Sequence, residues 1–439
     1  MITGTSAAES KVLLECIGGR NASAEGSIAM NGTLWSRKTK RSIAYVIEED
    51  LFYETVTVRE HLIFQARLRL GKTLTEAQYM LRVDEIIEEL GLAHRRDALV
   101  GGAGRRGILR WERKLLSIAT EMLSNPSVVL VEEPTSGLDS LSSEIVMLKL
   151  QQLARSGRTV VVTVHHPTSE VFALVDTLHL LSEGAVVYSG NASEAMAYFA
   201  SLNYECPAHL NPIGYYLRLL VVDSREADHV GAGRLAMLRG EWAKREAEAE
   251  IEATPFKTDD SADADGMATA SLDFFSQLNV LITRNVIRLL RYRYWFFWMI
   301  IWVLVVAVVF GLIFLQLDTT QRGIQNTSGA FFYLMLVLIV LMAYRTFAHL
   351  PLDLALMSRE RSGGWYYVIS WFVSRSLCAV PREILLPVVF FVPIYFLMDV
   401  GYGFSVYFYM QLMLILVSSA AIGLGYLVMS IFRRVWLAW

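Results

Sequence analysis

The chain has little cysteine, and its three cysteines are scattered. Cys16, Cys206 and Cys378 form no CxxC pair and no cluster with histidine. A disulfide framework or a zinc site is therefore not predicted, and buried or lipid-facing thiols fit this spacing better. A net charge of -3 provides no overall basic field, so the composition does not favour a nucleic-acid-binding protein.

The N-terminal stretch MITGTSAAESKVLLE lacks a basic start and a long apolar core, so no cleavable signal peptide is predicted. Charge is also scarce: charged residues make up 19% of the 439 residues and hydrophobic residues 54%, with a mean hydropathy of +0.38. This composition is too apolar for an ordinary soluble protein. Apolar stretches of about 20 residues, the length that crosses a bilayer, lie only in the second half.

The first half, residues 1–222, has the pattern of a soluble α/β domain. SVVLVEE and RTVVVTVHH are short β-branched runs, typical of strands buried on both faces of a mostly parallel sheet. Between them lie segments with helical periodicity. One begins with a capping threonine and ends at Gly91, and another ends at Gly157. Alternating strands and helices predict crossover units.

A change of composition separates the two halves. Residues 223–270 are charged, alanine-rich and then acidic, which predicts a solvated helix followed by a flexible linker. Residues 271–293 mix apolar side chains with several arginines. That pattern indicates an amphipathic helix at the membrane surface.

Four membrane spans are predicted after this helix. Prolines 381, 387 and 393 are expected to interrupt the third. Arginine-rich flanks before the first span and at SRERSGG place those loops, and with them the soluble domain, in the cytoplasm. The spans lie near residues 295–317, 329–350, 365–398 and 406–432.

Paired carboxylates follow one of the predicted strands, in VVLVEEPTSGLDS. Two acids after an apolar run more often end a strand than form a catalytic pair, although a strand end in an open α/β sheet can carry a phosphate site. The full string resembles the Walker B motif and D-loop of ATP-binding cassette transporters. In that resemblance Glu132 replaces the usual aspartate, Glu133 matches the catalytic glutamate, and Ser136 to Asp139 match the D-loop.

Other segments resemble the same family in the expected order. TVVVTVHHPTSEVF is similar to the H-loop strand, with His165 at the switch position. IAYVIEEDLFYETVTVREHLIF resembles the Q-loop segment, with Glu48 where glutamine is usual. SRERSGGWY before the third span, NPIGYYLRLL, and a nucleotide domain that precedes the spans resemble the G subfamily, the white and sterol or drug half-transporters.

The resemblance implies an α/β P-loop NTPase-like domain followed by an α-helical transmembrane domain, with four of six spans present. It also implies ATP and Mg²⁺ as cofactors, and a homo- or heterodimer with a second half-transporter. The activity would be export of a hydrophobic small molecule across the lipid bilayer. Glu133 would position or activate water, His165 would contact the γ-phosphate, and Glu132 would lie on the magnesium side.

The phosphate loop departs from its pattern. In the pattern GxxxxGK[ST], the glycines let the backbone approach the phosphates, the lysine neutralises their charge, and the hydroxyl binds the metal. One register places Gly4 first, with Glu9, Ser10 and Lys11 on the second glycine, the lysine and the hydroxyl; shifting by one leaves Val12 as metal ligand. Neither register is sound. A carboxylate about 4 Å from a phosphate charge costs on the order of 4 kcal/mol. The candidate nucleotide-binding residues are Gly4, Ser6, Ser10, Lys11, Glu48 and Asp139.

The signature loop departs as well. The family's SGGE corresponds here to Leu109, Arg110, Trp111 and Glu112. Bulky side chains replace glycines where backbone amides approach the γ-phosphate across the dimer, although Arg110 would add positive charge. Productive closure is not expected. Both ends also differ from the family: the sequence predicts no strand before Gly4, and spans five and six are missing, which is consistent with a truncated gene model or fragment.

Charged residues inside the predicted spans have two interpretations. Arg345 and the Arg382–Glu383 pair are costly in hydrocarbon and are expected to face the protein interior or an interface. They would then form a polar relay that couples nucleotide state to the membrane domain. Alternatively, they lie at the headgroup boundary and extend their charges to water. The sequence leaves both open.

Three functions stay open at this point. The first is an ATP-coupled half-transporter, for which the retained Glu133, Asp139 and His165 argue. The second is a catalytically impaired partner subunit of a heterodimer, which the altered AAESK and LRWER segments favour. The third is a non-functional truncated gene product.

Overall fold

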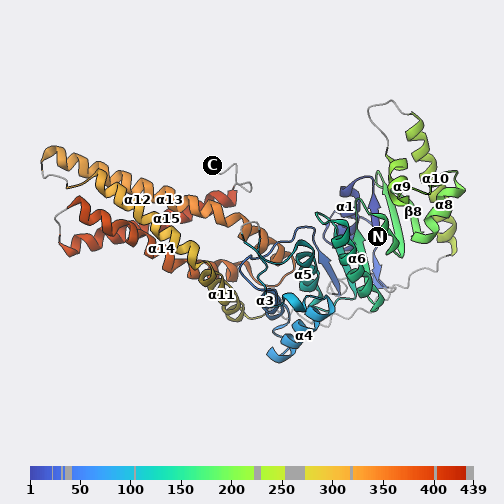
Figure 1. The fold of residues 1–439 in the computed structure, drawn as a ribbon, viewed down its shortest axis with the longest axis horizontal. Coiled ribbons are helices and arrows are strands. Elements are labelled where there is room, and N and C mark those ends of the chain that lie inside the picture. The colour runs from blue at the N-terminus through green and yellow to red at the C-terminus, as the bar shows by residue number, and fades with distance from the viewer. Residues whose placement is uncertain are drawn as a thin grey trace. The chain divides into compact units, whose positions relative to one another are not determined.

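The computed structural model describes residues 1–21, 23–30, 33–34, 42–102, 105–221, 229–252, 272–316, 320–399 and 403–431. The chain forms two compact units, each described by itself (Figure 1). The first contains Met1–Asp50, Thr57–Ala66 and Thr73–Thr269. The second contains Leu51–Val56, Arg67–Lys72 and Ala270–Trp439.

A six-stranded sheet forms the centre of the first unit, in the order β4-β5-β6-β1-β7-β8. All neighbours are parallel except β7 and β8, which confirms the predicted α/β class. Val129, Leu130 and Val131 are fully buried in β5, as their β-branched run predicts. The strands are β1 (Ile2–Gly4), β4 (Ile43–Val46), β5 (Val128–Glu132), β6 (Thr159–Thr163), β7 (Thr177–Ser182) and β8 (Ala185–Asn191), with β2 (Ala29–Met30) and β3 (Thr33–Leu34) forming a separate pair.

The helix α4 begins and ends at the residues that the sequence predicts. Thr75 precedes α4, its N–H donating to Gln78 Oε1 at 2.9 Å, and Gly91 follows with φ of +74°. The helices are α1 (Ala7–Ile17), α3 (Val58–Leu70), α4 (Glu76–Glu89), α5 (Arg110–Met122), α6 (Ser140–Arg155), α7 (Ser169–Ala173), α8 (Ala195–Ser201), α9 (Pro212–Leu220) and α10 (His229–Glu252), with short 3₁₀ turns at Ala93–Arg95 and Ala192–Glu194.

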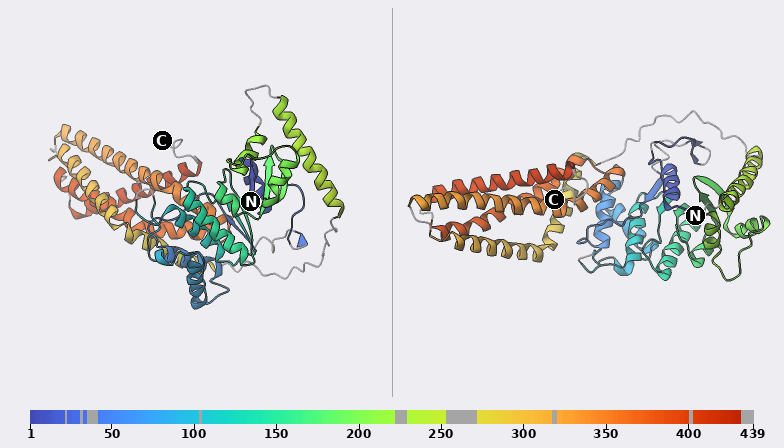
Figure 2. Two further views of the ribbon diagram at one scale, coloured as in Figure 1. Left: turned by 45° about the vertical axis from the view of Figure 1, so that its right-hand side comes forward. Right: turned by 90° about the horizontal axis from the view of Figure 1, so that it is seen from above.

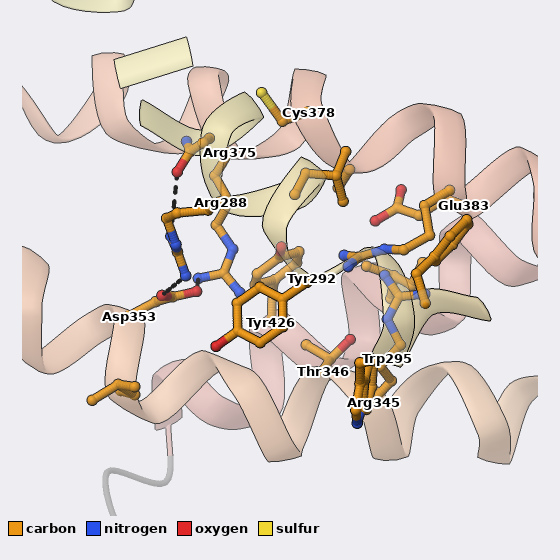
Figure 3. A pocket seen from close by; sticks show the side chains of 17 residues that line it. Arg288, Tyr292, Trp295, Arg345, Thr346, Asp353, Arg375, Cys378, Glu383 and Tyr426 are labelled. Carbon is orange, nitrogen blue, oxygen red and sulfur yellow. Dashed lines mark hydrogen bonds and ion pairs between the residues drawn. The ribbon is translucent and has the colours of Figure 1, made fainter. Parts of the chain in front are cut away.

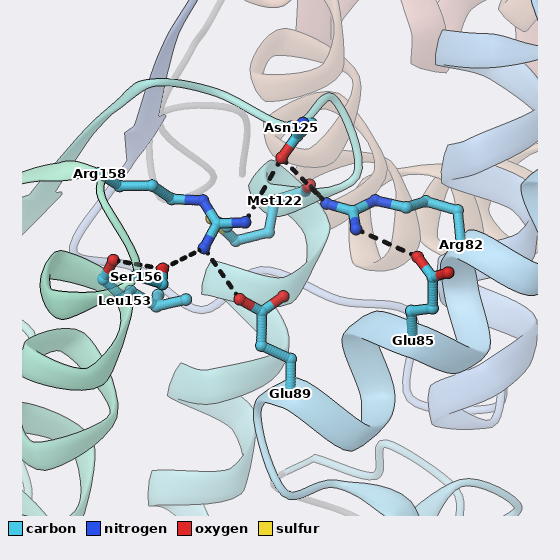
Figure 4. Close-up of polar contacts among 8 residues, drawn as sticks. All are labelled: Arg82, Glu85, Glu89, Met122, Asn125, Leu153, Ser156 and Arg158. Carbon is cyan, nitrogen blue, oxygen red and sulfur yellow. Dashed lines mark hydrogen bonds and ion pairs between the residues drawn. The ribbon is translucent and has the colours of Figure 1, made fainter.

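Arginines join these helices at the end of the sheet where β5 and β6 begin (Figure 4). Arg158 Nη1 donates to Glu89 on α4 and to Ser156 after α6, at 2.9 and 2.7 Å. Arg82 donates to the Met122 carbonyl of α5 at 3.2 Å. Half-buried arginines with several acceptors fix the helices on the edge opposite the strand ends that carry the acids.

Two expectations for the first unit are wrong. A strand does include the residues before Gly4, since Ile2–Gly4 forms β1; three residues are too few for a periodic signal. The charged helix α10 is not simply solvated. Leu238 is fully buried and the Trp242 ring lies 5.3 Å from Tyr188 of β8. The linker predicted after it lies outside the described residues.

The second unit contains an amphipathic helix and four helices long and apolar enough to cross a membrane, among the residues described. Both views of Figure 2 show α12–α15 side by side. Their core includes Phe310, Leu334, Phe390 and Leu414. The helices are α11 (Phe274–Arg291), α12 (Arg293–Ile313), α13 (Gln321–Ser362), α14 (Val368–Met398) and α15 (Phe404–Ile431).

The expected interruption of the third span is wrong. The helix α14 continues through Pro381, Pro387 and Pro393. Membrane helices tolerate internal proline because neighbouring groups satisfy the freed backbone. The second span is also longer than the predicted 329–350, because α13 extends to Ser362 and includes Pro351.

A short segment from the first half of the sequence, Leu51–Val56, belongs to the second unit. Tyr53 is 5% exposed, and the Arg288 guanidinium stacks 3.7 Å from its ring centre. Arg291 donates to the Thr55 carbonyl at 2.7 Å and Arg359 to the Leu51 carbonyl at 3.1 Å. Backbone acceptors of this segment are thus held by arginines of α11 and α13.

Candidate functional site

The predicted catalytic residues lie at the ends of adjacent parallel strands. Glu132 ends β5 opposite Thr163, which ends β6. The Glu133 N–H donates to the Thr163 carbonyl at 3.1 Å, and Glu133 Oε2 accepts from the His165 N–H at 3.2 Å. Glu133 has φ of 41°, a left-handed backbone that non-glycine residues seldom adopt. The structure therefore brings Glu133 and His165 together at one sheet edge.

Burial raises the pKa of the Glu133 carboxyl above its ordinary value. The His165 N–H opposes this, and repulsion from Glu48 adds to it. A carboxylate held less acidic than usual is suited to accept a proton, as general bases in enzymes are.

His165 is half-buried and its Nδ1 has no hydrogen-bond partner among the described residues. Burial, and next the His166 ring 4.1 Å away, lower the pKa of His165, while the Gly4 backbone opposes them. The imidazole is therefore neutral near pH 7, with a nitrogen that a ligand can use.

Glu132 is surrounded by donor groups of the protein. It is 3% exposed, and it accepts hydrogen bonds from the Tyr45 hydroxyl and, at 3.2 Å, from the Glu48 N–H. Lys11 Nζ lies 3.4 Å from Glu132 Oε2. Although burial lowers the pKa of Lys11, the Glu132 carboxylate outweighs it and holds this pKa above the ordinary value. Lys11 is thus a cation facing Glu132.

The same geometry does not fit a magnesium ion. Magnesium needs oxygen ligands in near-octahedral order. At Glu132 an ammonium group and a backbone N–H already contact Oε2, and the Tyr45 hydroxyl contacts Oε1. In the register that starts at Gly4, Lys11 also stands where the family has the hydroxyl that binds the metal.

The phosphate loop is short. Only Thr5 and Ser6 separate β1 from α1, and the Ser6 hydroxyl accepts the Ala8 N–H at 3.3 Å as the N-cap. Ser10 is already inside the helix and 2% exposed. A Cβ on Gly4 would stand 3.5 Å from Glu9 Oε2. That oxygen is buried without a hydrogen-bond partner among the residues described, so a carboxylate faces the place where phosphate would enter.

The remaining predicted residues of this edge have local partners. Glu48 Oε1 accepts the Ser136 hydroxyl at 2.9 Å, linking the Q-loop position to the D-loop. Asp139 is exposed and is the N-cap of α6, accepting the Ser142 N–H at 3.4 Å. The Ser142 side chain, and to a smaller extent backbone N–H groups, lower the pKa of Asp139.

The signature segment begins α5. Leu109 is its N-cap, and its N–H donates to Glu112 Oε2 at 2.7 Å. Burial raises the pKa of the fully buried Glu112, but hydrogen bonds from Leu109, Arg95 and His94 hold it below its ordinary value. Arg110 is exposed and donates to the Gly137 carbonyl of the D-loop at 3.3 Å. Trp111, the bulky residue at a glycine position, is half-buried.

Two residues of the edge were missed by sequence reasoning. Tyr45 on β4 contacts Glu132, and Lys114 on α5 donates to the Glu48 carbonyl at 2.6 Å and pairs with Asp50 at 3.3 Å. Lys114 is 2% exposed. Its place on the apolar face of α5 was the available signal, because a lysine there needs an acceptor.

The predicted coupling residues lie in the second unit. Arg382 and Glu383 of α14, with Arg345 of α13, line a cavity of about 250 Å³. Arg345 Nη1 and Arg382 Nε are buried and have no hydrogen-bond partner in the described part of the chain.

Two family models match the chain, one described as ABC transporter at residues 1–136 and one as ABC-2 type transporter at residues 276–437. Protein white of Drosophila melanogaster is 30% identical over 438 residues, which is 97% of this chain and 64% of that protein. ABC transporter G family member 22 of Arabidopsis thaliana is 31% identical over 454 residues, 97% of this chain and 60% of its own. The broad substrate specificity ATP-binding cassette transporter ABCG2 of Sus scrofa is 30% identical over 424 residues, which is 90% of this chain and 64% of that protein.

The chain thus spans about two thirds of the length of the relatives it matches, or somewhat less. Its first matched region binds ATP with magnesium in the family as a whole, and its second is an integral membrane domain. The chain belongs to the ATP-binding cassette transporters, in the group of white-type and G family half-transporters.

Proposed function

We propose that this chain is one half of a dimeric transporter that uses ATP to export a hydrophobic or amphipathic substrate across a membrane. The observation that carries the proposal is the contact of Glu133 with His165 at the ends of β5 and β6, in a chain with four membrane-length helices. Two acids at a strand end are common, but here they lie in a region that matches the ABC transporter model and precedes a match to the ABC-2 type membrane model.

Glu133 acts as the base or water-positioning group in this proposal. Its raised pKa favours proton acceptance near neutral pH. His165, neutral and with a free Nδ1, donates to or accepts from the terminal phosphate. A general base of this kind contributes about 10²–10⁴-fold to rate.

The affinity for magnesium-bound ATP is low in the proposal. Glu9 faces the phosphate position and Lys11 neutralises Glu132 where a metal would be held. Lys11 is left as the cation nearest the phosphates. The partner subunit completes each site, since the signature segment of one nucleotide domain faces the phosphate loop of the other in this family.

Coupling to the membrane follows the chain itself. Glu48 contacts Ser136 in the nucleotide unit, and Leu51–Val56, three residues on, is held by arginines of α11 and α13. A shift of Glu48 on nucleotide binding therefore moves the segment Leu51–Val56, to which those arginines donate hydrogen bonds. We assign Arg382 and Glu383 a supporting role in that movement.

A second candidate is an impaired partner subunit that contributes membrane helices without hydrolysing ATP. The specific observation for it is the Lys11–Glu132 ion pair. The relatives at about 30% identity over most of the chain do not favour it.

The test uses the purified full chain in lipid nanodiscs, alone and with a co-purified partner. We expect ATP turnover that Glu133→Gln reduces at least 100-fold, while Glu144→Gln, a carboxylate lost from α6, leaves it unchanged. Turnover equal in the wild type and Glu133→Gln overturns the proposal. Absence of ATP binding at millimolar concentration supports the partner subunit instead.

A further inference from the structure

The second unit contains a charged cavity among its helices (Figure 3). It has a volume of about 250 Å³ and is formed by α11, α12, α13, α14 and α15. Four arginines and two carboxylates line it, so two positive charges are not compensated. These residues are Arg288, Arg345, Arg375, Arg382, Asp353 and Glu383.

On one side of the cavity, a single carboxylate lies between two arginines. Arg288 Nη2 donates to Asp353 Oδ1 at 3.0 Å. Arg375 Nη1 lies 2.6 Å from Asp353 Oδ2, in an ion pair without hydrogen-bond geometry. Asp353 thus serves two arginines at once, and both of its oxygens are used.

The other side also has two arginines and one carboxylate, Arg345, Arg382 and Glu383, but no hydrogen bond or ion pair joins them among the residues that the structure describes. Arg345 Nη1 and Arg382 Nε are buried and have no hydrogen-bond partner among the residues that the structure describes. Glu383 attracts both guanidinium groups, and the two repel each other. Charges in a membrane domain are expensive and normally pair, so buried donors of this kind indicate a functional site.

The walls around these arginines are apolar and aromatic. Leu289, Phe296 and Ile422 line the cavity, together with Tyr292 and Trp295. Tyr292 is 41% and Trp295 49% exposed, so the cavity reaches the lipid-facing side at the start of α12. Tyrosine and tryptophan are typical of the headgroup level of a bilayer. A ligand with an anionic head and an apolar body fits this surface.

We propose that Arg345 and Arg382 bind a phosphate group, with the headgroup of an anionic membrane lipid as its first source. Guanidinium groups bind phosphate oxygens through paired N–H donors. A phosphomonoester carries up to two negative charges, which match the excess of two in the cavity. The volume admits a headgroup, and the acyl chains lie along Trp295 in the bilayer. Basic pockets between membrane helices on the cytoplasmic side are suited to such headgroups.

The test measures binding by the full chain in neutral detergent, by native mass spectrometry and by the unfolding temperature. The probes are dioctanoyl phosphatidic acid, dioctanoyl phosphatidylcholine and inorganic phosphate. We expect phosphatidic acid to bind at least tenfold more tightly than phosphatidylcholine and to raise the unfolding temperature. Equal binding of inorganic phosphate at the same concentrations identifies a soluble phosphate as the source. Equal binding of the two lipids overturns the proposal.

Three variants locate the site. Arg345→Met should weaken phosphatidic acid binding at least tenfold and should raise the unfolding temperature of the lipid-free protein, because an unmatched buried charge is removed. Glu383→Gln should tighten binding several-fold, since it removes the competing carboxylate. Arg361→Met, which removes an exposed charge from the same helix, is the control. An Arg345→Met variant that is less stable while lipid binding is unchanged shows a structural arginine and overturns the proposal.

Discussion

The carboxylates at the sheet edge and the arginines in the membrane unit differ in how fully they are partnered. Glu132 is 3% exposed and has a cation and two hydrogen-bond donors around it. Arg345 and Arg382 are buried in part with unpaired donors. A polar site whose partners all come from the protein leaves little for a ligand to gain, whereas unpaired buried donors gain fully from an incoming anion.

The difference teaches that motif positions and ligand capacity are separate properties. Glu132 lies where its motif predicts, yet Lys11 supplies the charge that a ligand or metal would otherwise supply. The arginine cavity matches no nucleotide motif but has a surplus of donors. Substitutions that remove the partners of Glu132, or that remove the arginines of the cavity, test this comparison.

The largest effect is expected at an ion pair in the second unit whose two side chains are both almost fully buried. Arg284 Nη1 donates to Glu360 Oε1 at 2.7 Å, and the two side chains are 3% and 4% exposed. Arg284→Met leaves Glu360 charged and buried, which costs about 3–5 kcal/mol in pairs of this kind. We expect a fall in the unfolding temperature, measured by thermal unfolding in neutral detergent.

The comparison is sharpened by the unmatched arginine. Arg345→Met in the same assay should raise the unfolding temperature of the lipid-free protein, and exposed Arg361→Met should not change it. The double variant Arg284→Met/Glu360→Met should recover much of the loss, because it leaves no unpaired charge. Equal losses for Arg284→Met and Arg345→Met would contradict the distinction between matched and unmatched charges.

A smaller effect is expected when the sheet edge is opened. The double variant Glu9→Gly/Lys11→Ser removes the carboxylate beside Gly4 and frees Glu132, and it restores the second glycine and the hydroxyl of the family's loop, although not its lysine. We expect magnesium-dependent ATP affinity to rise at least tenfold, measured by equilibrium binding with and without the metal. A carboxylate about 4 Å from phosphate costs on the order of 4 kcal/mol at an effective dielectric near 20, so the gain is bounded near three decades.

The control is the double variant Glu9→Gly/Lys11→Arg, because it keeps a cation beside Glu132. It should gain affinity without gaining magnesium dependence. If both double variants respond equally to magnesium, Lys11 does not occupy the metal's place.

Local sequence patterns predicted the strands, and the resemblance to the family implied that Glu133 and His165 serve one phosphate site. Each follows a β-branched run, and parallel neighbours bring their carboxyl ends to one edge. The Lys11–Glu132 pair was not predictable in this way. Its members are far apart in sequence, and their contact depends on α1 beginning at Ala7, directly after Ser6. Motif registers assume a loop, whereas good helix formers after a capping serine start the helix early.

The membrane unit shows the opposite balance. Hydropathy located all four spans, because apolar length is a strong signal. It did not find that α13 continues to Ser362 or that Asp353 serves Arg288 and Arg375. Those features depend on which helices pack together, and a sequence of charges does not specify that. The spacing of Arg345 and Arg382 likewise gave no hint of a shared cavity.

The smallest effect concerns the pH dependence of hydrolysis. Burial and the Glu48 charge hold the pKa of Glu133 above its ordinary value, so the active carboxylate form is present above that raised pKa and is lost as pH falls through it. Glu48→Gln removes one raising cause and should shift the acid limb of the rate profile to lower pH. Glu49→Gln, an exposed neighbour, should not shift it. Water screens charges at the open edge of the sheet, so the charge at Glu49 should have little effect on the half-buried Glu133. An equal shift with Glu49→Gln would mean that general surface charge, and not the charge of Glu48, raises the pKa of Glu133.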